Sequence, residues 1–365
     1  MIRNLATLAL AAVLLVAPGA ASARTADGKL KVGFALLWTI DDQGWTTAHY
    51  NAIQYLKKQL GDKIEVVYQE KVLGADAERV IRGFAEDDCD LIFGTTFDHM
   101  DPMLRVAKDY PDIKFENCSG YKLAPNMGNY FGRMYQAEYL AGYMAGLMGY
   151  KNVGTVSTHP LPETVRGVNA FTIGLEKGLK ESGAKYDPAK VDTVVWLKSW
   201  RDAMNETTLA ETLAGSGHDL IRQMADTPDS SIAACNAGVP AIGYGNDAAS
   251  AGADCALVST VFNWGPYYVR TVRSVLDGSW KSEAFWGGFE NNAVDLASMS
   301  EKVPADVRAK VMAEMKKLRA GRDAVFAGPL HDQSGTVLYD GKQPTDLELL
   351  QMQVLVQGVS GSLPK

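Results

Sequence analysis

Residues 31–60, KVGFALLWTIDDQGWTTAHYNAIQYLKKQL, contain the structural unit that recurs through most of the chain. The segment Lys31–Leu37 is a short, mostly apolar run, which indicates a strand. The segment Thr46–Leu60 repeats its apolar residues at helical spacing, which indicates an amphipathic helix. A polar loop with aromatic and acidic residues joins the two, so the stretch predicts a strand, a loop and a helix in that order.

The same unit recurs in two series. The first series continues with expected strands at residues 64–68, 91–95 and 113–117. The second series has expected strands at residues 153–157, 191–197, 220–224, 239–244 and 256–260. Expected helices lie between the strands at residues 75–86, 101–108, 135–148, 163–181 and 206–215. Repeated strand–helix units predict an α/β protein of parallel sheets with helices on both faces, and two series predict two lobes.

The division of the chain follows from these series. No linker rich in Pro, Gly or Ser separates the halves, so we expect short crossovers, with the chain passing between the lobes more than once. The expected amino-terminal lobe comprises residues 29–150 and about 259–285. The expected carboxy-terminal lobe comprises residues 151–258 and about 286–325. Residues 326–365 are expected to form an extension that packs back onto the lobes.

The first residues predict an exported protein. Arg3 precedes an apolar run at residues 5–16, and a site of small residues of the kind that a signal peptidase needs ends at Ala23. Residues 1–23 are therefore expected to be a signal peptide, because the apolar run is too short to span a bilayer. The mature protein is expected to be soluble and periplasmic.

The charge balance argues against nucleic acid as a partner. The chain has 36 Lys and Arg against 43 Asp and Glu, a formal net charge of −7. Nucleic-acid phosphates require a basic surface, which this composition does not favour. The acidic balance suits a protein that stays soluble and monomeric.

The four cysteines, Cys89, Cys118, Cys235 and Cys255, have spacings that match no common zinc or redox motif. An oxidising compartment permits disulfides. Cys235 ends a short helical stretch and Cys255 begins a strand two elements later, so this pair could meet. The alternative is buried free thiols, which are common in proteins.

Aromatic and acidic side chains follow the expected strands at the point where each strand ends. The residues concerned are Trp38, Asp42, Trp45, Phe97, Asp98, Trp200, Asp226, Asp247 and Trp264. Loops at the carboxyl ends of parallel strands form the ligand crevice of open α/β sheets, so we expect these side chains to converge. Aromatic faces beside carboxylates suit a flat, nitrogen-rich ligand, because a carboxylate accepts hydrogen bonds but cannot donate them.

Each of these residues also has a purely structural explanation. An Asp that follows a strand can cap the next helix, and this applies to Asp42, Asp98, Asp226 and Asp247. Large aromatic side chains at strand ends are often part of the core. Both explanations stay open at the level of sequence.

Five motifs, in order over both expected lobes, resemble one known family. They are Asp41-Asp42-Gln43-Gly44-Trp45, QAEYLAG at residues 136–142, RGVNAF at 166–171, GYGND at 243–247 and FWGG at 285–288. Over residues 31–286 the chain is similar to the basic membrane protein family of ABC-transporter substrate-binding proteins, which includes purine nucleoside receptors. The resemblance implies the type 1 periplasmic-binding-protein fold, in which two lobes, each a parallel sheet flanked by helices, hold the ligand in the cleft between them.

The resemblance also implies ligand-binding roles at the matching positions. Asp42 and Trp45 match the acid and the stacking aromatic residue of the family's first-strand loop. The other matching positions are Phe97 and Asp98 after the third strand, Trp200, Asp226 and Thr227 in the second lobe, and Asp247. Asn246, next to Asp247, is a further candidate, with a turn residue as the alternative.

Nucleoside receptors of this family use ribose-binding groups that include a lysine near the late Gly-Gly segment. Here Gly288 is followed by Phe289 and Glu290, which departs from that pattern. The bulky Trp38 and Trp264 are expected to fill the ribose volume. The comparison therefore favours a free purine base such as adenine or hypoxanthine over a purine nucleoside, with an ABC permease of the inner membrane as the protein partner.

Catalysis finds little support in the sequence. The five histidines show no metal-ligand spacing, and no nucleophile motif is present, so neither a metal nor a cofactor is expected; the histidines are His49, His99, His159, His218 and His331. A secreted hydrolase that uses Asp41 and Asp42 with Asp98 is the alternative from another class. A receptor for a sugar or an amino acid is the alternative with the same fold, although an amino acid would require an Arg or Ser/Thr set to bind its carboxylate.

Overall fold

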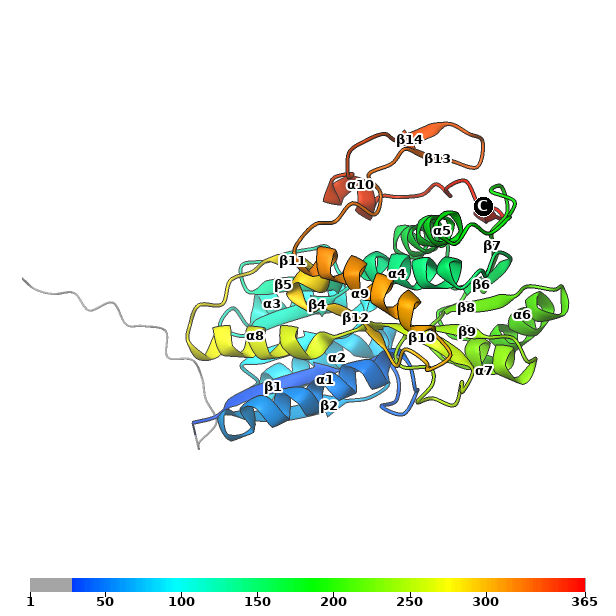
Figure 1. The fold of residues 1–365 in the computed structure, drawn as a ribbon. Helices are drawn as coiled ribbons and strands as arrows, with labels where there is room; N and C mark the ends of the chain where they lie inside the picture. The colour runs from blue at the N-terminus through cyan, green and yellow to red at the C-terminus, as the bar shows by residue number, and fades with distance from the viewer. Residues whose placement is uncertain (1–27, 365) are drawn as a thin grey trace, which may run out of the picture.

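The computed structural model describes residues 28–364 and divides them into two lobes, each built on one sheet (Figure 1). The first sheet has six parallel strands in the order β11-β5-β4-β3-β1-β2. The strands are β1 (Leu30–Ala35), β2 (Ile64–Gln69), β3 (Leu91–Gly94), β4 (Lys114–Cys118), β5 (Met127–Gly132) and β11 (Ala284–Gly287). The predicted two-lobe α/β fold is confirmed, while the predicted signal peptide lies outside the described residues.

The second sheet has seven strands in the order β12-β10-β9-β8-β6-β7-β15, of which β12 runs antiparallel to β10 and the other pairs are parallel. The strands are β6 (Val153–Ser157), β7 (Asp192–Trp196), β8 (Leu220–Met224), β9 (Ala241–Gly245), β10 (Ala256–Phe262), β12 (Val294–Ala297) and β15 (Val359–Ser360). The strand order reverses beside β1 in the first sheet and beside β6 in the second. Such a reversal opens a crevice at the carboxyl ends of the strands.

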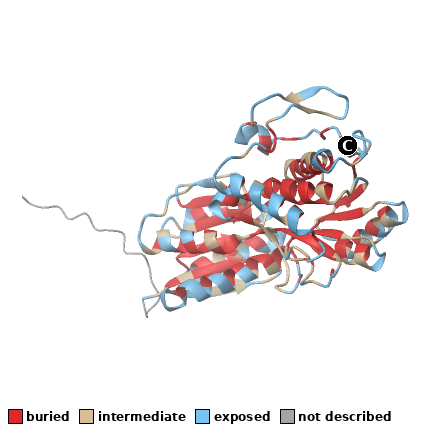
Figure 2. Ribbon diagram, in the orientation of Figure 1, coloured by how far each residue is buried: buried red, intermediate tan, exposed pale blue. Residues whose placement is uncertain are grey.

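Helices cover both faces of each sheet, and the strands between them are mostly buried (Figure 2). On the first sheet, Val32 and Phe34 of β1 pack with α1 and α8, whereas Ala35 packs in a separate cluster with α2 and α3. On the second sheet, α4, α5 and α9 cover one face, and α6 and α7 cover the other. The helices are α1 (Trp45–Leu60), α2 (Gly74–Glu86), α3 (Met100–Asp109), α4 (Met134–Leu147), α5 (Pro162–Ser182), α6 (Ala203–Gly215), α7 (Asp229–Asn236), α8 (Trp264–Leu276) and α9 (Ala305–Arg319). In residues 28–364, no helix is both long enough and apolar enough to cross a membrane.

The chain crosses between the lobes three times. The crossovers lie at Arg133 between β5 and α4, at Asn263 between β10 and α8, and at residues 288–293 between β11 and β12. The expected first boundary at residue 150 therefore falls one helix too late, and the expected boundary at 258–259 lies inside β10. At both places the chain passes directly from a strand into a helix, with one residue between them, so no linker marks the crossover in the sequence.

Helix α4 belongs to the second lobe because its backbone packs directly against that of α5. A Cβ on Gly142 of α4 would lie 2.0 Å from the Phe171 carbonyl oxygen of α5. A Cβ on Gly174 of α5 would lie 2.0 Å from the Tyr139 carbonyl oxygen of α4. Only glycine permits backbones to approach this closely, so the two helices form one rigid layer.

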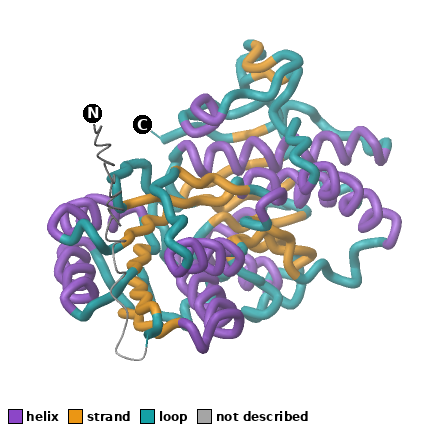
Figure 3. Tube along the Cα trace, turned by 90° about the vertical axis from the view of Figure 1, so that its left-hand side faces the viewer, coloured by secondary structure: helices purple, strands orange, loops and turns teal. Residues whose placement is uncertain are grey.

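The last residues form an extension that lies over α5, with a hairpin projecting from the top of the molecule (Figures 1 and 3). Its elements are the antiparallel pair β13 (Leu330–His331) and β14 (Val337–Tyr339), helix α10 (Asp346–Leu350), and β15 at the edge of the second sheet. Arg166 and Asn169 of α5, both buried, donate to the carbonyl oxygens of Leu349 and Val354 at 2.6 and 2.7 Å. These bonds fix the extension to the second lobe.

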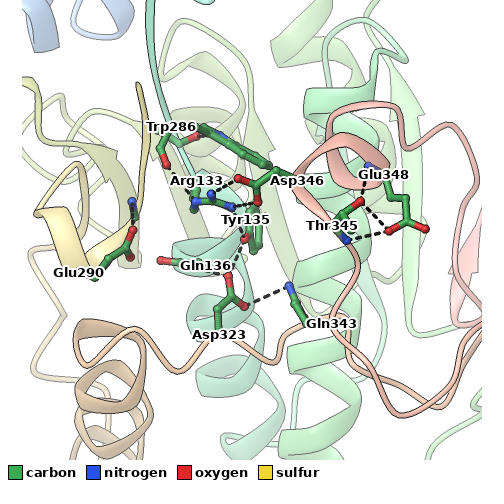
Figure 4. Close-up of polar contacts among 12 residues, drawn as sticks. Arg133, Tyr135, Gln136, Trp286, Glu290, Asp323, Gln343, Thr345, Asp346 and Glu348 are labelled. Atoms are coloured by element: carbon green, nitrogen blue, oxygen red, sulfur yellow. Dashed lines mark hydrogen bonds and ion pairs between the residues drawn. The ribbon is translucent and has the colours of Figure 1, made fainter. Parts of the chain in front are cut away.

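The extension also reaches the first crossover (Figure 4). Arg133 donates from both terminal nitrogens to the Asp346 carboxylate, at 2.8 and 2.6 Å. Asp323 accepts from the Tyr135 hydroxyl at 2.5 Å and from the Gln136 amide at 2.9 Å. The segment that leaves the first sheet is thus tied to the extension by one ion pair, and by two hydrogen bonds to Asp323, which lies between α9 and the extension.

The structure settles the possible disulfide. Cys235 at the end of α7 and Cys255 just before β10 are bonded, with their Cα atoms 5.3 Å apart. Cys89 and Cys118 are buried free thiols. Burial raises the pKa of the Cys89 thiol to about 12, so this group is an inert part of the core.

Candidate functional site

Loops at the carboxyl ends of the two sheets contact each other, and this boundary between the lobes is here called the cleft. The Trp45 amide, from the first lobe, donates to the Asp226 carbonyl oxygen of the second lobe at 3.2 Å. The Asn246 side-chain amide donates to the Gln43 carbonyl oxygen at 3.0 Å. A Cβ on Gly44 would lie 1.6 Å from the Asp226 carbonyl oxygen, so a side chain there would hold the lobes apart. Asn246 therefore contacts the opposite lobe.

Asp226, after β8, places an unpaired carboxyl at this contact. Its backbone is held on both sides, because its amide donates to the Trp200 carbonyl oxygen at 3.1 Å and its own carbonyl accepts from Trp45. Its carboxyl makes no hydrogen bond to any residue in 28–364. Burial, and next the negative charges of Glu163 and Asp42, raise the pKa of this carboxyl well above its ordinary value. This half-buried carboxyl is therefore free to accept a hydrogen bond from a ligand.

Asp247, after β9, has one satisfied carboxyl oxygen. Its Oδ2 accepts from the Ser250 hydroxyl at 2.6 Å and from the Ser298 hydroxyl. Its Oδ1 is buried and has no partner among residues 28–364. The two serines thus orient the carboxylate and leave one oxygen available.

Other buried polar atoms at strand ends lack a partner in the described chain, including three that the sequence analysis missed. Asn117 Oδ1 lies in β4, while Ser157 Oγ and Thr158 Oγ1 lie at the end of β6. The signal for these residues was weak, because each is a small polar residue that closes an apolar run. Together they add hydroxyl and amide groups at the carboxyl ends of one strand in each lobe.

Two half-buried tryptophans follow strands of opposite lobes. Trp38 comes after β1, its buried Nε1 has no partner within residues 28–364, and the Arg201 guanidinium of the second lobe lies 5.8 Å from its ring centroid. Trp200 comes after β7 and meets the His159 ring edge-on, with centroids 5.2 Å apart. Each indole therefore keeps part of its surface free of protein contacts.

Trp45 and Trp264 are instead packed among aromatic rings, which include Phe262 of the second lobe. The Trp45 indole donates to the Thr95 carbonyl oxygen at 2.8 Å, and its ring meets the Trp264 ring edge-on. Trp264 is 1% exposed and stacks on Phe262 and His49, with centroids 4.6 and 5.3 Å apart. The expectation that Trp264 fills a ribose volume in the cleft does not fit this position, because neighbouring rings cover it.

Asp42 and Thr227 are engaged in internal hydrogen bonds. The Asp42 carboxylate accepts from the amides of Gly44, Thr46 and Thr47 at 2.9–3.0 Å, which caps the start of α1. The Thr227 hydroxyl donates to the Glu206 carboxylate at 2.9 Å. The capping alternative thus accounts for Asp42, and Thr227 supports α6.

Phe97 and Asp98 lie at the surface. Phe97 is 49% exposed and its ring lies 6.1 Å from that of Tyr121. Asp98 is exposed next to it. The two residues follow β3 as predicted, but their side chains are not enclosed with Asp226 and Asp247.

Two cavities, of about 560 and 260 Å³, lie beneath the extension and away from the cleft. None of the buried, unpartnered polar atoms of residues 28–364 belongs to a residue that lines either cavity. In the same part of the chain, no group of three or more His, Cys, Asp or Glu is placed to hold a metal ion. The unmet hydrogen-bonding capacity therefore makes the cleft the stronger candidate for a ligand site.

Comparisons with known proteins agree with this architecture. Residues 29–320 match the family described as Bmp, ABC transporter substrate-binding protein PnrA-like. The chain is 37% identical, over 93% of its length and 95% of the relative, to a purine-binding protein of Brucella abortus. It is 35% identical, over 89% of its length and 79% of the relative, to a putative ABC transporter glucose-binding protein of Haloferax volcanii.

Among solved structures, an ABC transporter solute-binding protein of Conexibacter woesei superposes with a TM-score of 0.65. It is 26% identical, and the match covers 80% of this chain and 97% of that one. These similar proteins bind solutes for transport, and their fold is the type 1 periplasmic-binding-protein fold expected from the sequence motifs. The chain belongs to the PnrA-like Bmp family of ABC transporter substrate-binding proteins.

Proposed function

We propose that this substrate-binding protein captures a purine, as a free base such as adenine or hypoxanthine, and delivers it to its ABC permease. The observation that carries the proposal is the half-buried Asp226 carboxyl, which has no hydrogen-bond donor in residues 28–364 and lies at the contact between the lobes. Purine edges present N–H groups, which an acceptor-only carboxylate can bind. The relative named as a purine-binding protein supports this choice of ligand.

The proposed site combines stacking and hydrogen bonding. Trp38 and Trp200 supply aromatic faces, each worth about 1–3 kcal/mol when a base stacks on it. Asp226 and the free oxygen of Asp247 accept from ring or exocyclic N–H groups, each bond contributing about 1.5–3 kcal/mol. After the cost of association, these contacts are sufficient for micromolar affinity, about −8 kcal/mol.

The choice between a free base and a nucleoside depends on the ribose. Phe289 is buried and Glu290 accepts from the Gly288 amide, so this segment supports the crossover and supplies no lysine for ribose. Trp38 remains the bulky residue proposed to occupy the ribose volume. A purine nucleoside is the alternative ligand if the Trp38 side chain moves aside.

A sugar is a second candidate because one relative is named as a putative glucose-binding protein. Carboxylates such as Asp226 accept hydrogen bonds from sugar hydroxyls as well as from N–H groups. We favour the purine because the stacking surfaces lie on both lobes.

Transport would couple to closure of the cleft. Members of this family act outside the cytoplasm and hand a small-molecule ligand to a permease. We infer a monomeric periplasmic protein in which the ligand binds one lobe first and then gains contacts from the other, which shifts the population towards the closed form. The interlobe hydrogen bonds of Trp45 and Asn246 form in that closed form.

The test is ligand binding by the purified mature protein after it has been unfolded, stripped of ligand and refolded. Its melting temperature is recorded with purine bases, nucleosides, pyrimidines, sugars and amino acids, because a ligand of the folded state raises the midpoint. Shifts with free purine bases support the proposal. Shifts with nucleosides alone would move the assignment to a nucleoside receptor, and shifts with sugars alone would overturn the purine assignment.

A further inference from the structure

A second carboxyl, that of Glu163, lies in the wall that the second lobe contributes to the cleft. Glu163 is in the first turn of α5, five residues after Thr158. At the end of β6, the buried hydroxyls of Ser157 and Thr158 lack partners in the described chain. Tyr244 of β9 donates to Glu163 at a long 3.4 Å. The carboxyl is therefore held only loosely by the groups around it.

The charged groups that act on Glu163 belong to the second lobe. On its own helix, Arg166 attracts it, but the Arg166 guanidinium donates to the carbonyl oxygens of Pro162 and Leu349 instead of the Glu163 carboxylate. From the end of β8, Asp226 repels it, and across the cleft it acts on Cys118 of β4. Burial raises the pKa of the Glu163 carboxyl to about 7, against the pull of Arg166 and the Tyr244 hydroxyl.

The carboxyls of Glu163 and Asp226 are therefore both difficult to ionise. Two neighbouring carboxylates repel each other and cannot both ionise easily in a desolvated site unless donors or cations are present. The described chain donates no hydrogen bond to the Asp226 carboxyl and one long hydrogen bond, from Tyr244, to the Glu163 carboxyl. A ligand that donates to both carboxyls would remove the repulsion and the desolvation cost together.

We propose that Glu163 is a specificity-determining residue of the cleft, which accepts one N–H group of the bound heterocycle while Asp226 accepts another. This inference rests on the proposed function and narrows it to ligands that present two N–H donors. Ligands that carry phosphate or carboxylate are rejected by the same two groups, because like charges repel in a desolvated site. When such a donor ligand binds near neutral pH, the protons held by Glu163 and by Asp226 pass to the buffer, so that both carboxylates can accept.

The experiment compares Glu163→Gln with Glu116→Gln as a matched control. Glu116 is a buried glutamate of the first lobe whose pKa is also raised to about 7 by burial, but both of its oxygens are bonded, to Tyr267 and Trp280. Binding of adenine and hypoxanthine to refolded, ligand-free protein is measured by titration calorimetry between pH 6 and 8. Two buffers of different ionisation enthalpy give the number of protons released.

For Glu163→Gln we expect a roughly 10- to 100-fold loss of affinity, because a hydrogen bond to a charged group is lost. Proton release should be smaller than in wild type, because only the Asp226 carboxyl can then give up a proton on binding. Glu116→Gln should keep the wild-type affinity and proton release. If wild type binds purine and Glu163→Gln matches it in both quantities, the inference is overturned and the proposed function stands. If wild type binds no purine, the proposed function itself fails.

A second variant keeps the test decisive if Glu163→Gln does not fold. Glu163→Asp retains the charge and shortens the side chain, so we expect weaker binding with proton release preserved. An affinity equal to that of wild type would overturn the role of Glu163 as a direct acceptor. Melting curves of both variants without ligand identify a folding defect before the titrations are interpreted.

Discussion

Buried polar atoms without partners in the described chain occur in both walls of the cleft, but the acidic residues of the two walls differ in how far their own chain satisfies them. In the first lobe, the Asp42 carboxylate is bonded to three amides and the Trp45 indole to a carbonyl oxygen, and Trp264 is covered by other rings. In the second lobe, the Asp226 carboxyl has no hydrogen bond within the described chain, and one oxygen of Asp247 is buried without a partner. In both walls, the residues concerned are Asp and Trp side chains that follow the carboxyl end of a strand.

This difference distinguishes side chains that stabilise the fold from side chains that are available to bind a ligand. Side chains that already have partners stabilise the fold, and their loss is felt with or without a ligand. Side chains that are desolvated without partners cost free energy in the empty protein and regain it when a ligand supplies the missing donor. We therefore expect substitutions in the first wall to change the free energy of unfolding, and substitutions in the second wall to change affinity.

The largest effect is expected for Trp264→Ala, which should lower the free energy of unfolding by about 3–5 kcal/mol, because it removes a fully buried ring and leaves a cavity. Urea denaturation of the ligand-free protein measures it. Trp200→Ala is the matched control, since Trp200 is half-buried and should cost much less stability. A stable Trp264→Ala protein that no longer binds purine would break the comparison and return Trp264 to the ligand site.

Asp226→Asn should weaken purine binding by about 1.5–3 kcal/mol, because the neutral amide replaces the charged carboxylate that accepts an N–H group of the ligand. Calorimetric titration measures the loss, with the exposed Asp98→Asn as control. The raised pKa fixes the sign of the effect on stability. The folded state holds the proton more tightly than the unfolded state, so the stability due to this group is full below the ordinary Asp pKa and is lost as pH rises through the folded pKa.

The ligand-free Asp226→Asn protein should consequently be as stable as wild type at low pH and at least as stable at neutral pH. Melting temperatures recorded across this range check the sign. A variant that melts lower than wild type at neutral pH would show that the ionised carboxyl has a stabilising partner in the protein, which would make Asp226 a structural residue like Asp42.

Trp38→Ala should weaken purine binding by about 1–3 kcal/mol through the loss of one stacking surface. Its dissociation constant is compared with that of Phe97→Ala, a surface aromatic residue on the same lobe. The expected result is a loss for Trp38→Ala alone. Equal losses of affinity in both variants would place the ligand nearer the exposed Phe97. No loss of affinity in either variant would restrict recognition to the second lobe.

The fold was largely predictable because the spacing of apolar residues shows which segments are strands and which are helices packed against a sheet. Strands at 153–157 and 220–224 were predicted with their observed bounds, and most helices began within a few residues of the expected position. Strand β5 was missed because its sequence, MGNYFG, contains two glycines and an asparagine and has no apolar alternation. The crossovers were misplaced because close backbone packing, such as that of α4 on α5, is a tertiary property that hydrophobic periodicity does not record.

The candidate site was predictable in position but not in role. Asp42 and Asp226 occupy equivalent places after strands, and both had capping and ligand-binding explanations. What separates them is their contacts. The amides of Gly44, just before α1, and of Thr46 and Thr47 in α1 donate to the Asp42 carboxylate, whereas the Asp226 carboxyl lies near other charged groups. Such contacts depend on how the lobes meet, so sequence patterns could not assign the roles.

The smallest effect, and the sharpest test of the comparison, is expected at Asp42, where the two walls interact. Asp42→Ala removes the cap of α1 and should lower the free energy of unfolding by about 1 kcal/mol. Asp42→Asn keeps a capping side chain, so the stability of this variant should stay near that of wild type although the charge is lost.

Because the Asp42 charge helps to raise the pKa of the Asp226 carboxyl, Asp226 should ionise more easily in both variants. Both variants should therefore bind purine at least as tightly as wild type. Urea denaturation and titration of the pair therefore distinguish a capping residue from a ligand contact: a shared loss of affinity would make Asp42 part of the binding site, and a loss of stability confined to Asp42→Ala would assign it to the fold.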